Sequence, residues 1–326
     1  MRAVVLREHG GPEVLAVTDA PVPVAGPEEI LVRVHATALN RADLLQRMGL
    51  YPNPFPCGPD IPGMEFAGTV ESCGERVTAW KEGDTVMGIV SGGAYAEKLV
   101  IHERQAMATP PGMSLVDAAA IPEVFITAWD ALVVQGGLTS GRWAMVHAGA
   151  SGVGTAAIQI CRAVGARVIV TCSARKVQAC RELGADVVVD YGTQDFVAEV
   201  ATATGGNGVD VILDVIGGEY VARNVASLAV KGRIIQVGVM DGKPQVFNVG
   251  MLLGKRATIT GTVLRGRPTE EKIAISRRFA AEMLPLFSSG AMKPVVDSVY
   301  PIEDIRAAHE YMASNANVGK IVVTLG

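Results

Sequence analysis

A short glycine-rich segment is the clearest candidate for chemistry in this sequence. Residues 147 to 159 read HAGASGVGTAAIQ, in which Gly149 and Gly154 fit the outer positions of G-x-G-x-x-G and Ser151 stands at the middle one. In such a turn, glycines bring backbone N–H groups close to a pyrophosphate, and the following helix N-terminus adds positive potential. The alternative is a tight turn that binds no ligand. The residues expected to hold a dinucleotide here are Gly149, Ser151, Gly152, Val153 and Gly154.

Ser151 offers a backbone N–H, as a glycine would, and in addition a hydroxyl that a glycine lacks. We expect it to anchor the phosphates or the nicotinamide, with a contribution to catalysis as the lesser hypothesis.

The residues about 20 positions further on indicate which dinucleotide binds. An NAD site usually has an acidic side chain there, bonded to the ribose 2′-OH. This sequence has Thr171-Cys172-Ser173-Ala174-Arg175-Lys176, with no acid. A hydroxyl and cations bind a 2′-phosphate that a carboxylate would repel. Because basic residues at a helix N-terminus oppose the helix dipole, they favour a bound anion over a merely solvated helix start. Ser173 and Lys176, or Arg175, therefore predict NADPH.

Two further positions follow expected strands of the same sheet. Tyr191 comes after Val189-Asp190, where it either contacts the adenosine end of the cofactor or is a half-buried strand-end tyrosine. Gly238 follows another strand and either allows the cofactor to approach closely or is a plain turn glycine.

The elements around the glycine turn alternate between apolar Val/Ile runs and helical segments. This alternation is typical of a doubly wound α/β domain with a parallel sheet covered on both faces. The expected strands are 144–147, 167–171, 187–190, 209–214, 233–237 and 257–261, and the expected helices are 155–164, 176–183, 196–203 and 220–229.

The flanking regions have a different texture. Residues 1 to 122 contain short β-type runs separated by Pro- and Gly-rich stretches such as YPNPFPCGPDIPG at 51–63, which predicts a β-rich, barrel-like unit. The last part, with helices expected at 270–288 and 302–313 and strands at 295–300 and 320–325, does not continue the alternation. It is expected to fold back onto the first unit.

The charge, the cysteines and the apolar runs of the sequence argue against several classes of protein. The 326 residues carry a net charge of −4 and contain no block of five like charges, which argues against a nucleic-acid partner. Five cysteines without a C-x-x-C pair give neither a disulfide framework nor a zinc ribbon. The sequence contains neither a signal-peptide core nor an apolar run long enough to span a membrane, so we expect a cytoplasmic protein.

Three motifs beside the glycine turn carry a family resemblance. ALNRADLLQRMGLYP at 38–52, AAAIPEVFITAWDAL at 118–132 and AGASGVGTAAIQ resemble the zinc-free NADPH:quinone oxidoreductases of the medium-chain dehydrogenase/reductase superfamily, of the p53-inducible and zeta-crystallin type. The resemblance covers the whole chain. It implies a Rossmann NADPH-binding domain, residues 123–265, inserted in a GroES-like catalytic domain of residues 1–122 and 266–326. It also implies homodimers joined through the sixth-strand region.

The resemblance also bears on metal chemistry. Asn40 stands where zinc-dependent relatives carry a Cys ligand, and Met64 stands in place of a His ligand, so no metal is expected. Without a Lewis acid, the substrate must accept hydride readily, as a quinone does. The alternatives are an alkenal or enone C=C reductase and a non-catalytic NADPH-binding protein.

Candidate substrate-side residues complete the set. Tyr51 is expected to donate a hydrogen bond or a proton to the quinone oxygen, unless it only packs its loop. By resemblance, Asn40 and Thr127 lie near the nicotinamide, although Asn40 could simply close a turn and Thr127 bond to its own helix. Lys320 either reaches the 2′-phosphate or is a surface lysine. An ion pair is expected between Arg41 and Asp43.

Overall fold

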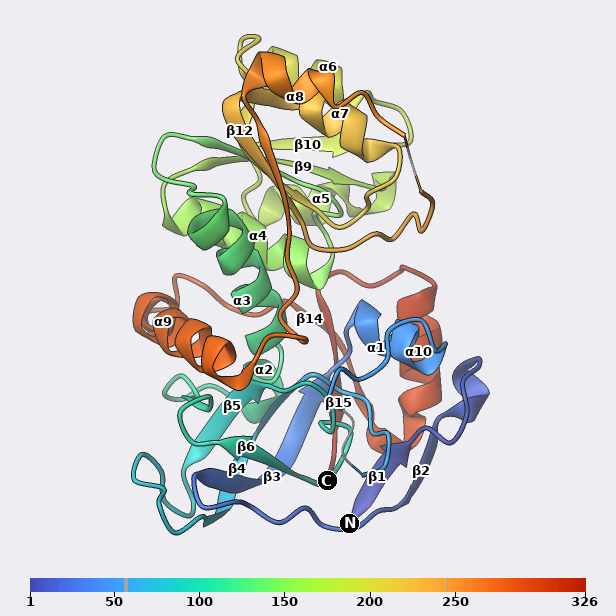
Figure 1. Cartoon of the computed structure of the whole chain (residues 1–326), viewed down its shortest axis with the longest axis vertical. Coiled ribbons are helices and arrows are strands. Elements are labelled where there is room, and N and C mark those ends of the chain that lie inside the picture. Colours follow the sequence, from blue (N-terminus) through green and yellow to red (C-terminus); the bar gives the residue numbers. More distant parts are fainter. Residues whose placement is uncertain (56–57, 245) are drawn as a thin grey trace. The chain divides into compact units, whose positions relative to one another are not determined.

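The structure is a computed structural model that describes residues 1–55, 58–244 and 246–326 (Figure 1). It has two compact units, one formed by Met1–Ile126 with Leu264–Gly326 and the other by Thr127–Val263. The second unit is thus an insertion in the first, with boundaries within a few residues of those expected at 122/123 and 265/266. Cys57 lies outside the described residues.

The inserted unit contains a parallel six-stranded sheet with the strand order β10-β9-β8-β11-β12-β13. Successive strands first extend from β8 to one side and then, from β11 on, to the other, which is the doubly wound order. The strands are β8 (Trp143–Val146), β9 (Arg167–Cys172), β10 (Val187–Asp190), β11 (Val209–Asp214), β12 (Leu228–Gln236) and β13 (Thr258–Gly261). This sheet confirms the α/β fold class.

Helices connect these strands, as the alternation of the sequence predicts. They are α4 (Gly152–Ala163), α5 (Val177–Glu182), α6 (Phe196–Ala203), α7 (Tyr220–Ser227) and α8 (Gly250–Lys255), with the short 3₁₀ turn η3 (Ala174–Lys176) before α5. Strand and helix residues such as Ile169, Ile212, Phe196 and Val225 are fully or almost fully buried and form one core. Burial of this kind supplies most of the driving force for folding.

The other unit is built on a seven-stranded sheet with the order β14-β15-β3-β4-β5-β7, in which β6 also pairs with β3. Most pairs are antiparallel; β14 and β15 are parallel. The strands are β3 (Glu29–Ala38), β4 (Glu65–Cys73), β5 (Thr85–Ile89), β6 (Lys98–His102), β7 (Met107–Ala108), β14 (Val296–Pro301) and β15 (Lys320–Thr324). Since β15 pairs with β3, the last part of the chain completes the first sheet, as expected.

Helices and a small ribbon flank this sheet. They are α1 (Arg41–Arg47), α2 (Leu115–Ala118), α3 (Pro122–Trp129), α9 (Thr269–Ser288) and α10 (Ile305–Ala313), with 3₁₀ turns at Pro12–Val14 and Ile302–Asp304 and an antiparallel ribbon of β1 (Arg2–Val5) and β2 (Ala16–Asp19). The unit boundary falls within α3, which continues into a π-helical turn at Asp130–Gln135. No described helix is long and apolar enough to cross a membrane.

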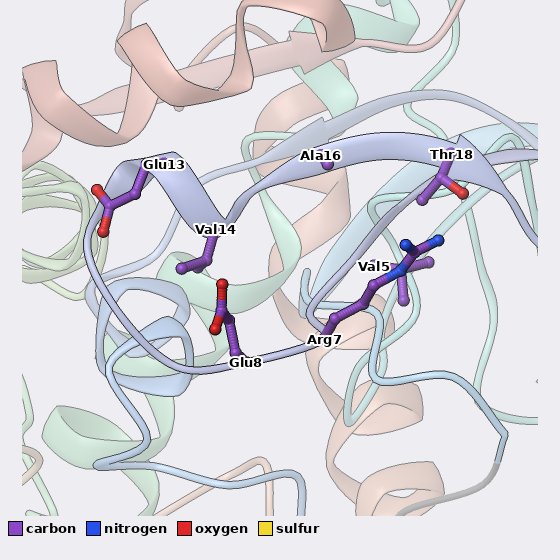
Figure 2. Close-up of a pocket in the computed structure, with 7 residues that line it drawn as sticks. All are labelled: Val5, Arg7, Glu8, Glu13, Val14, Ala16 and Thr18. Carbon is purple, nitrogen blue, oxygen red and sulfur yellow. The ribbon is translucent and has the colours of Figure 1, made fainter.

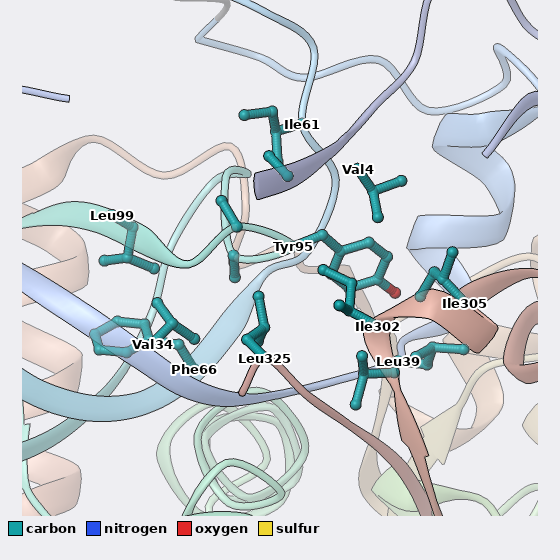
Figure 3. Packing of buried hydrophobic residues seen from close by; sticks show 14 of the residues in the cluster. Val4, Val34, Leu39, Ile61, Phe66, Tyr95, Leu99, Ile302, Ile305 and Leu325 are labelled. Atoms are coloured by element: carbon teal, nitrogen blue, oxygen red, sulfur yellow. The ribbon is translucent and has the colours of Figure 1, made fainter. Parts of the chain in front are cut away.

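Tyr95 sits inside the core of this unit, surrounded by aliphatic side chains (Figure 3). Its ring is fully buried and its hydroxyl is 3.1 Å from Asp43 Oδ2 and 3.3 Å from His309 Nε2. A buried phenol needs such partners, because an unsatisfied hydroxyl would cost about 1–3 kcal/mol. This contact joins the apolar core to the polar cluster described below.

Candidate functional site

The glycine turn joins the end of β8 to the start of α4. The backbone is left-handed at Ala148, with φ of 56°, and not at Gly149 or Gly154. Both glycines are instead required by close approach. A Cβ on Gly149 would lie 2.6 Å from Val170 Cβ, and one on Gly154 would lie 2.3 Å from the Ala148 carbonyl oxygen. The turn therefore packs its backbone tightly between β8, β9 and α4.

Ser151 is the N-cap residue of α4. Its Oγ accepts the Gly154 N–H at 3.1 Å, and its own N–H donates to the Ala148 carbonyl at 2.9 Å. The expectation that the Ser151 N–H is open to a phosphate is therefore wrong in this structure. Across the described chain, the N–H groups of Gly152 and Val153 have no protein acceptor. These two are the groups that a phosphate at this helix N-terminus can use.

The end of β9 lies beside the turn, since β8 and β9 are neighbours in register. Ser173 follows β9 and is the N-cap residue of η3, but its hydroxyl makes no cap hydrogen bond. Arg175 and Lys176 lie in η3, and no carboxylate occurs between Thr171 and Lys176. A hydroxyl and two cations at the carboxyl edge of the sheet suit a phosphate monoester.

Tyr191 follows β10, the strand next to β9. Tyr191 is 55% exposed, so its ring is open to solvent at the end of the strand and can contact a ligand or remain a strand-end tyrosine. Gly238 follows β12, and a Cβ there would lie 3.3 Å from the Val215 carbonyl oxygen. Thr127 is buried in α3, but within the described chain its hydroxyl makes no hydrogen bond to its own helix. That alternative is wrong.

A hydrogen-bonded trio is buried in the other unit. Lys320 Nζ lies 2.8 Å from Glu65 Oε1 and 2.7 Å from Asn40 Oδ1, while Asn40 Nδ2 donates to Glu65 Oε1 at 2.9 Å. The Lys320 ammonium also donates to the Leu39 carbonyl at 2.6 Å. Each of its three N–H bonds therefore has an acceptor. Lys320 is neither a surface lysine nor free to reach a phosphate, so both expectations for it are wrong; Asn40 is bonded inside the trio and does more than close a turn.

Asp43 adds a buried acid next to this trio. Its carboxylate accepts the N–H of Asn40 at 2.8 Å and that of Gly63 at 3.2 Å, in addition to the Tyr95 hydroxyl. Burial raises the pKa of Asp43 to about 6. Arg41 instead donates to Asn315 Oδ1. The expected ion pair between Arg41 and Asp43 does not form, because Asp43 faces the interior.

Tyr51 lies on a guanidinium group. The centroid of its ring is 5.2 Å from Arg265 Cζ, and Arg265 Nη1 donates to the Tyr51 carbonyl at 3.0 Å. Across the described residues, the Tyr51 hydroxyl has no hydrogen-bond partner. Burial raises the pKa of this phenol, so it remains a hydrogen-bond donor at neutral pH.

Glu123 is half-buried in the first turn of α3. Its backbone N–H donates to Glu65 Oε2 at 2.8 Å. Burial, and next the charge of Glu65, raise the pKa of the Glu123 carboxyl to about 8. It is therefore mostly protonated at neutral pH, and it is electrostatically coupled to Tyr51. A neutral carboxylic acid near a phenol is a typical arrangement for proton transfer.

We call Tyr51 and the polar residues that surround it in this unit the Tyr51 cluster. Sequence reasoning missed five of its polar residues: Asp43 as an acceptor, Glu65, Glu123, Arg265 and Lys272. Glu65 follows Met64 in a motif considered only for metal binding. The others occur in amphipathic or irregular segments, where nothing in the local pattern distinguishes a buried charge from an exposed one.

A surface hollow of about 290 Å³ lies elsewhere on this unit, along β1, β2 and the 3₁₀ turn at Pro12–Val14 (Figure 2). Arg7, Glu8 and Glu13 line it, and no residue of the Tyr51 cluster does. It is therefore separate from the candidate site. Over residues 1–55, 58–244 and 246–326, no three His, Cys, Asp or Glu side chains are grouped to hold a metal ion.

Comparisons with known proteins agree with this geometry. Family models described as "alcohol dehydrogenase GroES-like domain" and "zinc-binding dehydrogenase" match residues 26–111 and 152–281. The rat synaptic vesicle membrane protein VAT-1 homolog is 32% identical over all of this chain and 84% of its own length. The quinone oxidoreductase of Lama guanicoe is also 32% identical, over 100% of this chain and 98% of its own.

Solved structures share the whole fold. That of Escherichia coli quinone oxidoreductase complexed with NADPH has a TM-score of 0.90 and 30% identity, covering 100% of both chains. The JamJ enoyl reductase has a TM-score of 0.89 and 27% identity, covering 100% of this chain and 99% of its own. The chain belongs to the quinone oxidoreductase family of the medium-chain dehydrogenase/reductase superfamily.

Proposed function

We propose that this oxidoreductase reduces quinones with NADPH as the hydride donor. The observation that carries the proposal is the segment at the end of β9, residues 171–176, which contains Ser173, Arg175 and Lys176 and no acidic residue. This edge fits a 2′-phosphate, and the open N–H groups of Gly152 and Val153 fit a pyrophosphate. NADPH supplies the hydride when bound. The remaining cofactor contacts that we propose are made by Ser151, Tyr191, Gly238, Thr127 and Asn40.

On the substrate side, we propose that Tyr51 contacts the carbonyl oxygen that receives charge. Its hydroxyl has no partner in the described chain, and its raised pKa keeps it protonated, so it can donate a hydrogen bond. We also propose that no metal takes part. Glu65 is held by Lys320 and Asn40, and Met64 offers only a thioether.

The test is a panel of acceptors and cofactors, followed by the absorbance of the reduced nicotinamide. We expect quinones to be reduced faster than enals, and kcat/KM for NADPH to exceed that for NADH at least about tenfold, since a charge-assisted hydrogen bond contributes roughly 1.5–3 kcal/mol. In the Tyr51→Phe variant, quinone turnover should fall. Equal rates with NADH would contradict the cofactor assignment, and metal-independent alcohol oxidation would contradict the metal-free substrate argument.

A second candidate is reduction of an enone or enal C=C bond. Two observations favour it: the similarity to the JamJ enoyl reductase and the protonated carboxyl of Glu123, because C=C reduction requires a proton as well as hydride. Faster turnover of enals than of quinones in the same panel would select this reaction.

We further propose a homodimer. β13 is an edge strand of the parallel sheet, and four apolar residues shortly before and after it in the sequence are exposed: Val246, Val249, Leu253 and Val263. An uncovered strand edge beside apolar side chains favours pairing with a second copy.

A further inference from the structure

Lys272 is a buried cation without a partner of opposite charge. It lies in the first turn of α9 and is 5% exposed. Its ammonium hydrogen-bonds to Ser91 Oγ and lies 5.0 Å from the ring centroid of Phe55. Among the described residues, no carboxylate pairs with it. An ammonium has three N–H bonds, so two of them have no acceptor among residues 1–55, 58–244 and 246–326, at a position where desolvation is costly.

Arg265 places a second cation on the same serine. Its guanidinium donates to the Ser91 carbonyl at 2.6 Å, to the Tyr51 carbonyl at 3.0 Å and to Gln46 Oε1 at 2.6 Å. All three acceptors are neutral. Two buried cations therefore lie around Ser91. Burying each charge costs desolvation energy, and the two positive charges repel each other.

Glu123, the acid that interacts electrostatically with Lys272, does not neutralise it. With a pKa of about 8, Glu123 is mostly protonated at neutral pH. The helix dipole further destabilises the charge of Lys272, because cations are disfavoured in the first turn of a helix. This local excess of positive charge is what an anionic ligand atom would offset.

Aromatic side chains lie next to the two cations. The Tyr51 ring lies over Arg265, and the Phe55 ring lies near Lys272 and is 51% exposed. A ligand that reached Lys272 would therefore meet a solvent-exposed aromatic ring beside it. A flat conjugated ring with an oxygen that becomes negative matches both the aromatic side chains and the unsatisfied N–H bonds.

We propose that Lys272 is a further catalytic residue, whose ammonium hydrogen-bonds to the substrate oxygen on which negative charge develops during reduction of a conjugated carbonyl compound. Arg265 is then the positioning residue that fixes Tyr51 and Ser91 around that oxygen. This proposal deepens the proposed function and rests on it for the identity of the reducible substrate.

The reaction balances without a bond to Lys272. Hydride from a dihydronicotinamide adds to the conjugated carbon, the C=C π electrons shift toward the carbonyl, the C=O π electrons move onto oxygen, and the resulting oxyanion takes one proton from solvent to give the enol. For a quinone this enol is a keto tautomer of the hydroquinone, which forms when the ring carbon loses a proton to solvent and the second carbonyl oxygen gains one. Lys272 stabilises the oxyanion before that proton arrives.

Binding of 4-nitrophenol with NADP⁺ present tests the site without turnover. The affinity for 4-nitrophenol is measured below and above the pH at which this phenol ionises. The two values give the affinities for the neutral phenol and for the phenolate. In Lys272→Met, which keeps the apolar stem, we expect phenolate affinity to fall about tenfold and phenol affinity to change little. Lys272→Arg should restore part of the phenolate affinity. The matched control is Lys81→Met, an exposed lysine of the same unit, which should change neither.

Turnover provides the second readout. With a quinone, we expect kcat of Lys272→Met to fall roughly 100-fold, as for loss of one oxyanion donor, with unchanged NADPH affinity. Lys272→Gln removes the same charge by a different substitution. The melting temperatures of both variants show whether either one has a folding defect. Unchanged phenolate affinity in both Lys272→Met and Lys272→Gln would overturn the proposal even if wild-type protein reduces quinones. If wild-type protein reduces none but binds phenolate through Lys272, the oxyanion site stands and the proposed function fails.

Discussion

Glu123 and Asp43 are acids that the folded chain holds at raised pKa values. Burial raises that of Glu123 from 4.5 to about 8 and that of Asp43 from 3.8 to about 6. For an acid of this kind the folded state binds the proton more tightly than the unfolded state. The free energy of unfolding therefore falls as pH rises, between 3.8 and about 6 for Asp43 and between 4.5 and about 8 for Glu123.

This predicts a pH-dependent effect of Glu123→Gln. Between pH 5 and pH 8.5 the melting temperature of the wild-type protein should fall further than that of the variant. The two decreases should differ by roughly 2–4 °C, the shift that corresponds to ~1 kcal/mol. The half-buried side chain justifies a value well below the full effect of the pKa difference. Melting curves at both pH values measure it, with Glu75→Gln, an exposed glutamate, as the control. Parallel pH profiles for Glu123→Gln and wild-type protein would contradict the assignment.

At the residue scale, sequence reasoning succeeded where local spacing itself carries the chemistry. The turn around Gly149 and Gly154 has a recognisable spacing, although it is close backbone approach that requires glycine there. Lys320 was misjudged because its three acceptors belong to Leu39, Asn40 and Glu65, all far earlier in the sequence. Arg265 and Lys272 were missed for a similar reason: both converge with Tyr51 and Ser91 only in the folded unit.

At the scale of elements, the connection from β8 to α4 depends on close contact between the backbone of the turn and a side chain of β9. The space beside Gly149 is filled by Val170 of β9, whose side chain is fully buried. A methyl group there must displace β9 or the turn, since core packing leaves no room for it.

Gly149→Ala should therefore destabilise the inserted unit by about 1–3 kcal/mol, the usual cost of overpacking. Gly254 of α8 is the matched control, because a Cβ there meets nothing within 4 Å. Gly254→Ala should stabilise α8 by roughly 0.5–1 kcal/mol, since alanine loses less backbone entropy in a helix. Urea unfolding of the two variants measures both effects, and a stable Gly149→Ala protein would refute the packing argument.

The parallel strands were predictable because both faces of the sheet are covered, which makes each strand a nearly continuous apolar run. The elements of the other unit were less predictable. α1 is short, and its N-terminal capping contact comes from the inward-facing Asp43. α8 is a six-residue helix without a buried residue, so no apolar periodicity marks it.

At the scale of the whole molecule, the proposed homodimer gives a direct measurement. Light scattering of the native protein should give twice the chain mass of 34.1 kDa. A double substitution of exposed apolar residues, Val249→Asp with Leu253→Asp, should shift the protein toward monomer, because it places charges on the exposed apolar segment that precedes β13. Val24→Asp, at another exposed valine, is the control. A monomeric wild-type mass would reject the dimer.

The pairing of β15 with β3 has a consequence for synthesis on the ribosome. The hydrogen bond between Asn40 and Lys320 can form only after 280 further residues have been synthesised, which takes roughly 15 to 55 s at 5–20 residues per second. During that time the contiguous inserted unit can fold, while the β3 edge that β15 will cover stays open to strands of other nascent chains. The segment Leu264–Gly326 thus protects the segment Met1–Ile126 late in synthesis, because its strand β15 covers the edge of β3 that the insertion leaves open until then.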